Sequence, residues 1–205
     1  TPVFYNDIDN FMLCSFTCSE DLISLYNCFD DQEVKDLRLN AFFEAREDEQ
    51  YKVAKVVEKV YDCFVIRSAE LYLNKAEAEA MLDKAEAKQT IKTLLNNRFE
   101  GGIPDVDGLN EKDLISFIRD ERRRELCFEA HRWFDLRRYA VSSKYPEKKS
   151  IRHETYDKNG VLEGDYVLKP YGEDPAWVLP IPGYEIVYNQ GNLVDNPQRV
   201  ERKLE

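Results

Sequence analysis

The sequence has no apolar run approaching the roughly 18 residues that a membrane-spanning helix needs. It has no recognisable signal peptide, and it begins with Thr1-Pro2 instead of methionine, so we interpret the chain as trimmed. The short catalytic signatures are also absent, since neither G-x-S-x-G, HExxH, a P-loop nor another Gly-rich phosphate loop occurs. None of these short motifs therefore identifies a catalytic residue.

Basic residues are too few for a nucleic-acid-binding surface. The 205 residues include 29 Lys and Arg against 40 Asp and Glu, which gives a formal net charge of −11. Phosphate backbones are bound by a basic face, so this balance argues against nucleic acid as the main partner. Hydrophobic residues make up 43% of the chain, enough for a buried core. The length fits one domain or a large fragment of a longer protein.

Cysteine and histidine are too sparse for a zinc site. No C-x-x-C occurs, and the two histidines do not combine with the five cysteines in a metal-binding spacing. An odd number of cysteines cannot all pair within one chain. We expect mostly buried free thiols, with a Cys14–Cys18 disulfide as the alternative, and we expect neither a metal nor a cofactor. The cysteines are Cys14, Cys18, Cys28, Cys63 and Cys127.

Helical periodicity dominates the middle of the chain. The spacing predicts a helix over 64–82 and a second helix that is opened by a capping box over 83–86 and ended by Gly101-Gly102. The short turn between them predicts an antiparallel hairpin. The expected inner faces are Val65, Ala69, Tyr72, Ala76 and Ala80 on the first helix and Ala87, Ile91, Leu94 and Leu95 on the second.

A second pair of helices follows. Asn110 is placed to begin a third helix whose first turn Asp113 supports, and a fourth helical stretch covers 132–139. Two helix pairs in succession indicate tetratricopeptide-like packing, although the literal repeat consensus is absent. The apolar side of the third helix is expected to comprise Leu114, Ile115, Ile118, Arg122, Leu126 and Cys127.

The flanking regions are less regular. Residues 1–63 predict short helices and long ordered loops, with 51–61 ambiguous between strand and helix. Residues 141–205 predict a loop-rich tail, with a β-hairpin at Asn159-Gly160 and an extended, proline-fixed segment at 177–182 that packs across the helices. The expected fold is therefore mainly α: tetratricopeptide-like helical hairpins over 64–140, long ordered loops and a small β-hairpin.

Residues 121–139 (ERRRELCFEAHRWFDLRRY) carry the densest charge of the chain, four acids among six arginines. A glycosidase carboxylate pair needs one raised pKa, which neighbouring arginines would prevent. A di-metal bundle site needs Glu-x-x-His, whereas the spacing here is Glu129-x-His131. A nucleic-acid patch would be neutralised by the acids.

We therefore favour a structural ion-pair network over a catalytic or metal site. Arginine forks bind carboxylates in pairs and tolerate partial burial, and this segment supplies apolar surroundings. Glu121, Glu125 and Glu129 share one face if the helix is unbroken. The predicted network comprises Glu121, Arg122, Arg124, Glu125, His131, Arg132, Asp135 and Arg137.

The same segment resembles the E-R-R-x-E-[LF]-x-x-E-G-x-R-[WF]-x-D-L-x-R signature of SusD/RagB-like proteins, with Ala130 where Gly is usual. Other stretches agree in order along the chain. Residues 64–78 resemble the family's V-x-R-x-A-E-x-Y-L-x-x-A-E-A helix, and 85–98 resemble the next helix, which usually ends in arginine. Upstream, 24–38 resembles a segment ending in D-x-R, and 179–189 resembles the closing P-I-P-x-x-E-I-x-x-N. Since family members are longer, the chain looks like a C-terminal portion.

The resemblance implies a non-catalytic surface lipoprotein of Bacteroidetes. Such proteins bind a glycan, or sometimes a peptide, outside the outer membrane and cap a SusC-like TonB-dependent transporter. The membrane contact would be a lipid anchor absent from this chain. The alternative function is a tetratricopeptide-like scaffold that binds only protein.

In relatives the ligand sits on aromatic side chains in loops, which suits sugars because apolar ring faces stack on pyranose faces. No ligand residue carries over by motif. The candidates that we single out are Tyr5, Tyr145 and Trp177, from a wider set of loop aromatics that also includes Phe4, Phe11, Tyr156, Tyr166 and Tyr171.

Overall fold

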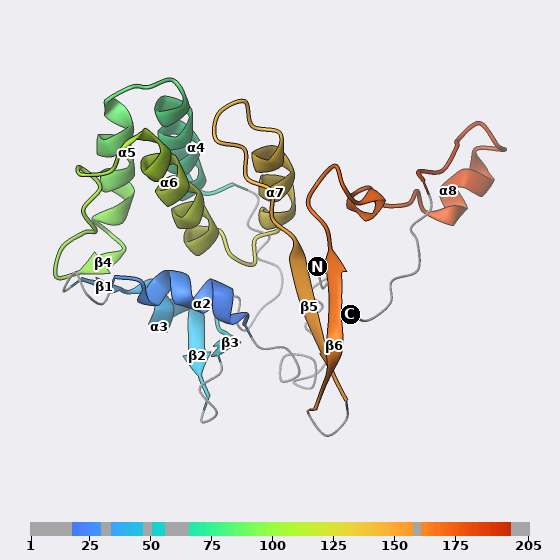
Figure 1. The fold of residues 1–205 in the computed structure, drawn as a ribbon, viewed down its shortest axis with the longest axis horizontal. Helices are drawn as coiled ribbons and strands as arrows, with labels where there is room; N and C mark the ends of the chain where they lie inside the picture. The colour runs from blue at the N-terminus through green and yellow to red at the C-terminus, as the bar shows by residue number, and fades with distance from the viewer. Residues whose placement is uncertain (1–17, 30–33, 47–50, 56–65, 158–160, 198–205) are drawn as a thin grey trace. The chain divides into compact units, whose positions relative to one another are not determined.

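A computed structural model of the chain describes residues 18–29, 34–46, 51–55, 66–157 and 161–197 (Figure 1). The chain divides into two compact units, residues 1–132 and 133–205. Several predicted features lie outside the described residues: Tyr5, Cys14, Cys63, Val65, the turn at Asn159-Gly160 and the charged end at 198–205.

Three helices form the main body of the first unit: α4 (Ser68–Met81), α5 (Glu86–Leu95) and α6 (Glu111–Glu125). Figure 1 shows them side by side, with α4 against both α5 and α6. This packing confirms the predicted helical hairpin and the mainly α fold. The buried apolar residues are Ala69, Leu73, Ala76 and Ala80 of α4, Ala87, Ile91, Leu94 and Leu95 of α5, and Leu114, Ile115 and Ile118 of α6.

Three details of the first hairpin differ from the prediction. The helix α4 begins at Ser68, not at residue 64, and Tyr72 is 41% exposed while Leu73 is fully buried. The buried face follows residues 69, 73, 76 and 80, so Ala69, Ala76 and Ala80 are confirmed and Leu73 takes the place of Tyr72. The start of the second helix also differs from the predicted capping box, because the N-cap residue of α5 is Ala85, not Asp83, and Asp83 adopts the left-handed conformation (φ 56°).

The predicted cap of α6 is confirmed. The side chain of Asn110 accepts a hydrogen bond from the backbone N–H of Asp113, at 3.0 Å, as an N-cap residue does. The helix α6 has 15 residues. Among the described residues, no helix is both long enough and apolar enough to span a membrane.

Short elements surround this body in the first unit. The helices α2 (Glu20–Asn27) and α3 (Arg38–Phe42) accompany two antiparallel strand pairs. In one pair, β1 (Lys35–Asp36) runs against β4 (Phe99–Glu100); in the other, β2 (Phe43–Ala45) runs against β3 (Tyr51–Val53). The ambiguous stretch 51–61 thus begins as a strand, and its continuation beyond residue 55 lies outside the described residues.

The helix α7 (Arg132–Ala140) confirms the fourth predicted helix, and all of it after Arg132 belongs to the second unit. The antiparallel strands β5 (Ile151–Tyr156) and β6 (Leu162–Leu168) form the predicted hairpin. The 3₁₀ helix η2 (Pro175–Trp177) and α8 (Gly183–Tyr188) follow. Of the predicted extended segment 177–182, Trp177 is the last residue of η2, and residues 178–182 are neither helix nor strand.

Candidate functional site

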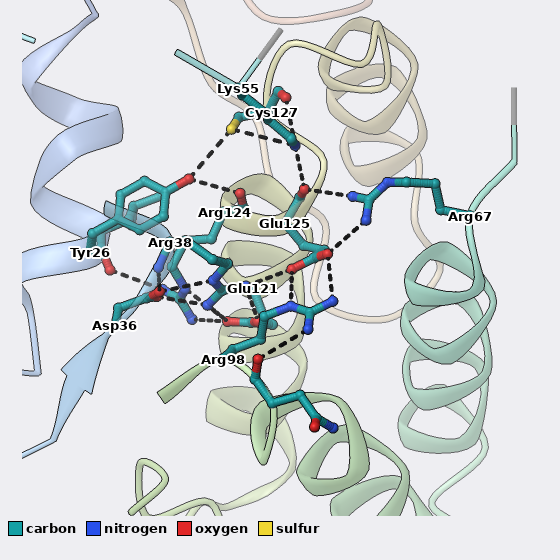
Figure 2. A network of polar contacts seen from close by, with 12 residues as sticks. Tyr26, Asp36, Arg38, Lys55, Arg67, Arg98, Glu121, Arg124, Glu125 and Cys127 are labelled. Carbon is teal, nitrogen blue, oxygen red and sulfur yellow. Dashed lines mark hydrogen bonds and ion pairs between the residues drawn. The ribbon is translucent and has the colours of Figure 1, made fainter. Parts of the chain in front are cut away.

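The carboxylate of Glu125, at the end of α6, is bound by three arginines from three different segments (Figure 2). Arg98 donates to both oxygens, with Nε–Oε2 at 2.8 Å and Nη2–Oε1 at 3.0 Å. Arg67 donates to Oε1 at 2.9 Å, and Arg38 donates to Oε2 at 3.0 Å. Since the residue is 1% exposed, this carboxylate is a buried anion surrounded by cations.

Glu121, one turn earlier on α6, is the second buried anion. Arg38 donates to its two oxygens at 2.6 and 3.2 Å, and Arg124 Nε donates to Oε2 at 2.8 Å. Asp36 completes the coordination of Arg38, accepting from Nε at 2.9 Å and from Nη2 at 2.7 Å. Arg38 therefore links β1 and the start of α3 to α6, because its guanidinium group forms one bidentate pair with Asp36 and another with Glu121.

Glu129 belongs to the same cluster although the helix has ended before it. Phe128 and Ala130 both have left-handed backbones (φ 62° and 63°), so the chain turns sharply there. Arg67 nevertheless donates to both Glu129 oxygens, at 2.9 and 2.8 Å, and Lys55 pairs with Oε1 at 2.5 Å. Lys55 also donates to the backbone carbonyls of Glu125 and Cys127, at 2.6 and 3.0 Å, and so satisfies carbonyls that the helix end leaves free.

We call these residues the ion-pair cluster. It contains four acids and five bases from the first unit: Asp36, Glu121, Glu125, Glu129, Arg38, Lys55, Arg67, Arg98 and Arg124.

The electrostatics of the ion-pair cluster hold its carboxylates ionised. Burial by itself would raise the pKa of Glu125, but hydrogen bonds from Arg98 and Arg67 and the charges of Arg38 and Arg98 lower it to about 2. Burial likewise opposes ionisation of Glu121, and Arg38 and Arg124 outweigh it, so that pKa is lowered as well. The pKa of Arg38 is raised, because Glu121 and Asp36 outweigh the effect of its burial. Neither glutamate can donate a proton near neutral pH.

The remaining residues of the predicted network lie elsewhere. Arg122 donates to Asn74 Oδ1 at 2.7 Å and pairs with Glu70 at 3.6 Å, which joins α6 to α4. His131 lies beside this second group, 3.9 Å from Glu70.

The other three predicted members lie on α7. Arg132 begins that helix. In the second unit Asp135 accepts from Arg138 at 3.1 Å, and Arg137 lies over the ring of Tyr171 at 5.1 Å. The structure therefore divides the eight predicted residues among three locations.

The predicted network lacked six members of the ion-pair cluster: Asp36, Arg38, Lys55, Arg67, Arg98 and Glu129. A signal for most of them was present. The D-x-R segment ends in Arg38, the first matched helix motif contains Arg67, and the second ends in Arg98. In the structure these three arginines all donate to Glu125, the second glutamate of the E-R-R-x-E motif. Lys55 lies in no matched motif and had no such signal.

Of the three predicted ligand contacts, Tyr5 lies outside the described residues, and the structure describes Tyr145 and Trp177. Trp177 is 1% exposed: its ring packs on Trp133 at 4.3 Å and meets Tyr171 edge-on at 5.9 Å, and its Nε1 donates to the Lys169 carbonyl at 2.7 Å. This corrects its choice as a sugar platform, because neither ring face is open to a ligand. Tyr145 is half-buried and has a left-handed backbone (φ 50°).

No group of three or more His, Cys, Asp or Glu side chains within the described segments has an arrangement that could hold a metal ion. The acids of the ion-pair cluster are instead bound by guanidinium and ammonium groups, which occupy the positions that a cation would need.

The described residues define a mainly helical protein of the tetratricopeptide-like class, in which helical hairpins are joined to short flanking elements by a buried ion-pair cluster. Residues 19–198 match the SusD family (SusD_RagB), and the chain belongs to that family.

Two relatives that are named as SusD-like proteins come from Formosa agariphila. SusD-like protein P2 is 28% identical over 142 residues, which cover 64% of this chain and 25% of the relative. SusD-like protein P38 is 40% identical over 79 residues, or 35% of this chain and 16% of the relative. The chain thus spans a quarter or less of the curated relatives that it matches.

A solved structure shares the fold. The SusD-like carbohydrate-binding protein from Bacteroides vulgatus superposes with a TM-score of 0.51 at 20% identity, covering 86% of this chain and 41% of that protein.

Proposed function

We propose that this chain is part of a non-catalytic glycan-binding protein at the outer cell surface, which passes its ligand to a SusC-like TonB-dependent transporter in the outer membrane. Membership of the SusD family over residues 19–198 carries the proposal. The Bacteroides vulgatus neighbour, named as a carbohydrate-binding protein, supports the ligand class. A lipid anchor outside this chain would hold the protein at the membrane.

The chemistry of the ion-pair cluster supports binding without catalysis. A glycosidase needs one carboxylic acid that is protonated near neutral pH. Glu121 and Glu125 have lowered pKa values and are enclosed by arginines, so they are poor proton donors. We assign to them a structural role, which is to anchor the segments that carry Arg38, Arg67 and Arg98 to the end of α6.

The net charge favours a neutral glycan over an anionic one. At −11 the protein repels anions at long range, whereas a neutral polysaccharide experiences no such effect. Among the aromatic candidates we retain Tyr145, because the residue is only half-buried, and Tyr5, which lies outside the described residues. Stacking of a sugar on either ring would be reinforced by hydroxyl contacts to neighbouring polar groups.

Affinity electrophoresis of the full-length protein in gels that contain neutral polysaccharides tests this function, with reducing ends assayed in parallel. We expect retarded migration on at least one polysaccharide and no release of reducing ends. Tyr145→Ala should weaken the retardation, whereas Tyr188→Ala, which removes an 82% exposed aromatic on α8, should leave it unchanged. Sustained release of reducing ends, abolished by Glu125→Gln in a folded protein, would contradict the proposal.

A protein-binding scaffold is the second candidate. It is favoured by the exposed apolar side chains on α4, where Leu71 is 60% and Tyr72 is 41% exposed. Affinity purification of the tagged full-length protein from its own membranes separates the two functions. A co-purifying TonB-dependent transporter together with glycan retardation supports the first function, whereas a stable protein partner without any glycan binding supports the second.

A further inference from the structure

Two thiols from distant parts of the sequence share one apolar cluster in the first unit. Cys127 follows α6 and belongs to a buried group that also contains Leu22, Ile23, Tyr26 and Phe43. Cys18 lies just before α2 and packs against this group, with its backbone N–H donating to the Tyr51 carbonyl at 2.9 Å. We propose that Cys18 and Cys127 form a structural disulfide bond when the protein folds under oxidising conditions.

The surroundings of the two sulfurs support this pairing. Cys127 Sγ lies 3.4 Å from the Tyr26 hydroxyl and 3.9 Å from Lys55 Nζ, so it sits between α2 and the ion-pair cluster (Figure 2). Burial raises the pKa of Cys18 to about 12, and the next contribution comes from the charge of Cys127. Cys28, at the far end of α2, is exposed and bonds only locally, to the Leu25 carbonyl at 3.1 Å.

The pKa shifts also indicate when the bond would form. Burial raises the pKa of Cys127 as well, although the Lys55 charge opposes the shift. Both folded thiols are therefore largely protonated near neutral pH and react slowly. The bond is expected to form during folding, before the cluster closes. Afterwards its burial protects it from reductants.

Oxidation of the two thiols requires an oxidant, which here is a disulfide such as oxidised glutathione or an oxidised thiol oxidoreductase. A thiolate of one cysteine attacks the oxidant and forms a mixed disulfide, releasing one thiol of the oxidant. The second cysteine then attacks this mixed disulfide and releases the other thiol. Two S–H bonds are lost and one S–S bond forms in the protein, while the S–S bond of the oxidant becomes two S–H bonds.

A bond here would join the segment before α2 to the residues after α6. The loop that it closes has more than roughly 100 residues, and long loops restrict the unfolded chain most. Oxidation should therefore raise the denaturant midpoint. The geometry is independent of the proposed glycan function, and so is the experiment, which uses no ligand.

The test is to refold the reduced full-length protein in a glutathione redox buffer, alkylate the remaining thiols, and analyse unreduced peptides by mass spectrometry. We expect a peptide pair that joins Cys18 to Cys127, together with alkylated Cys28. Cys18→Ser should remove the pair, and Cys28→Ser should keep it. Full alkylation of Cys18 and Cys127, or a bond from Cys18 to another cysteine such as Cys14, would overturn the proposal.

A second measurement does not depend on whether a variant folds. The denaturant midpoint of the unmutated protein is compared after refolding with and without the glutathione buffer. We expect a higher midpoint for the oxidised protein. An unchanged midpoint on oxidation would contradict a cross-link of this loop length.

Discussion

Arg98 and Glu125 form a bidentate pair, with Nε–Oε2 at 2.8 Å and Nη2–Oε1 at 3.0 Å. Arg98 follows α5 and precedes β4, whereas Glu125 is the last residue of α6. The pair therefore joins the ends of two helices that belong to different predicted hairpins. Because Glu125 also binds Arg38 and Arg67, one carboxylate connects four segments of the first unit.

Removal of that carboxylate should destabilise the protein severely. Glu125→Ala leaves three guanidinium groups without a shared buried partner, and loss of one partner of a buried ion pair costs about 3 kcal/mol or more. Urea denaturation gives the free energy of unfolding. Glu163→Ala, which removes an exposed glutamate on β6, is the matched control and should change stability by less than about 0.5 kcal/mol. Equal effects of the two substitutions would show that the cluster is not structural. Arg124→Ala should behave like Glu125→Ala.

The stability of the protein should fall in acid through Glu125. Its pKa is about 2 in the folded protein and 4.5 in the unfolded reference, so the folded state favours the ionised form. This contribution is complete above about pH 4.5 and is lost as the pH falls towards 2, by about 3 kcal/mol in total. The check is the free energy of unfolding between pH 2 and 7 for the unmutated protein and for Glu125→Gln. The difference between the two proteins should shrink with falling pH, and a constant difference would refute the linkage.

Ala130→Gly should stabilise the protein. Ala130 adopts a left-handed backbone (φ 63°), which costs a residue with a Cβ atom about 1–2 kcal/mol and costs glycine little. Glycine also makes the unfolded chain more flexible, so the expected net gain is about 0.5–1 kcal/mol. Thermal denaturation measures it. The control is Ala78→Gly in the middle of α4, which should destabilise by up to about 1 kcal/mol because that position is helical. Destabilisation by both substitutions would argue against strain at residue 130.

Trp177→Ala should lower the free energy of unfolding, and it should leave glycan retardation unchanged while the variant is folded. The substitution removes the ring contact with Trp133 and the hydrogen bond to the Lys169 carbonyl, and large-to-small core changes cost about 3–5 kcal/mol. Trp177→Phe keeps most of the packing but lacks the N–H donor, so its effect should be smaller. The free energy of unfolding is measured together with glycan retardation at a temperature where both variants are folded. Selective loss of retardation with unchanged stability would restore Trp177 as a ligand contact.

The helices were predictable because their signals are local. The inner face of α5 and the cap at Asn110 depend on residues within a few positions of each other, and the structure confirms both. The stripe on α4 was wrong by one position at Leu73, since an alanine-rich helix has two adjacent apolar stripes and only its neighbours select one. The conformation of Asp83 was missed for a similar reason, as a capping-box spacing does not fix the backbone angle before the helix.

Contiguous motifs were enough to predict the family, the helix pairs and the density of charge in residues 121–139. Which charges meet depends on how the chain folds in three dimensions. Arg38, Arg67 and Arg98 converge on Glu125 across separations of 87, 58 and 27 residues, while Asp135, only ten positions from Glu125 along the chain, lies in the other unit. A buried carboxylate pairs with those cations that the packed backbone brings within about 3 Å. That distance depends on how the helices and strands are arranged in space, not on sequence spacing.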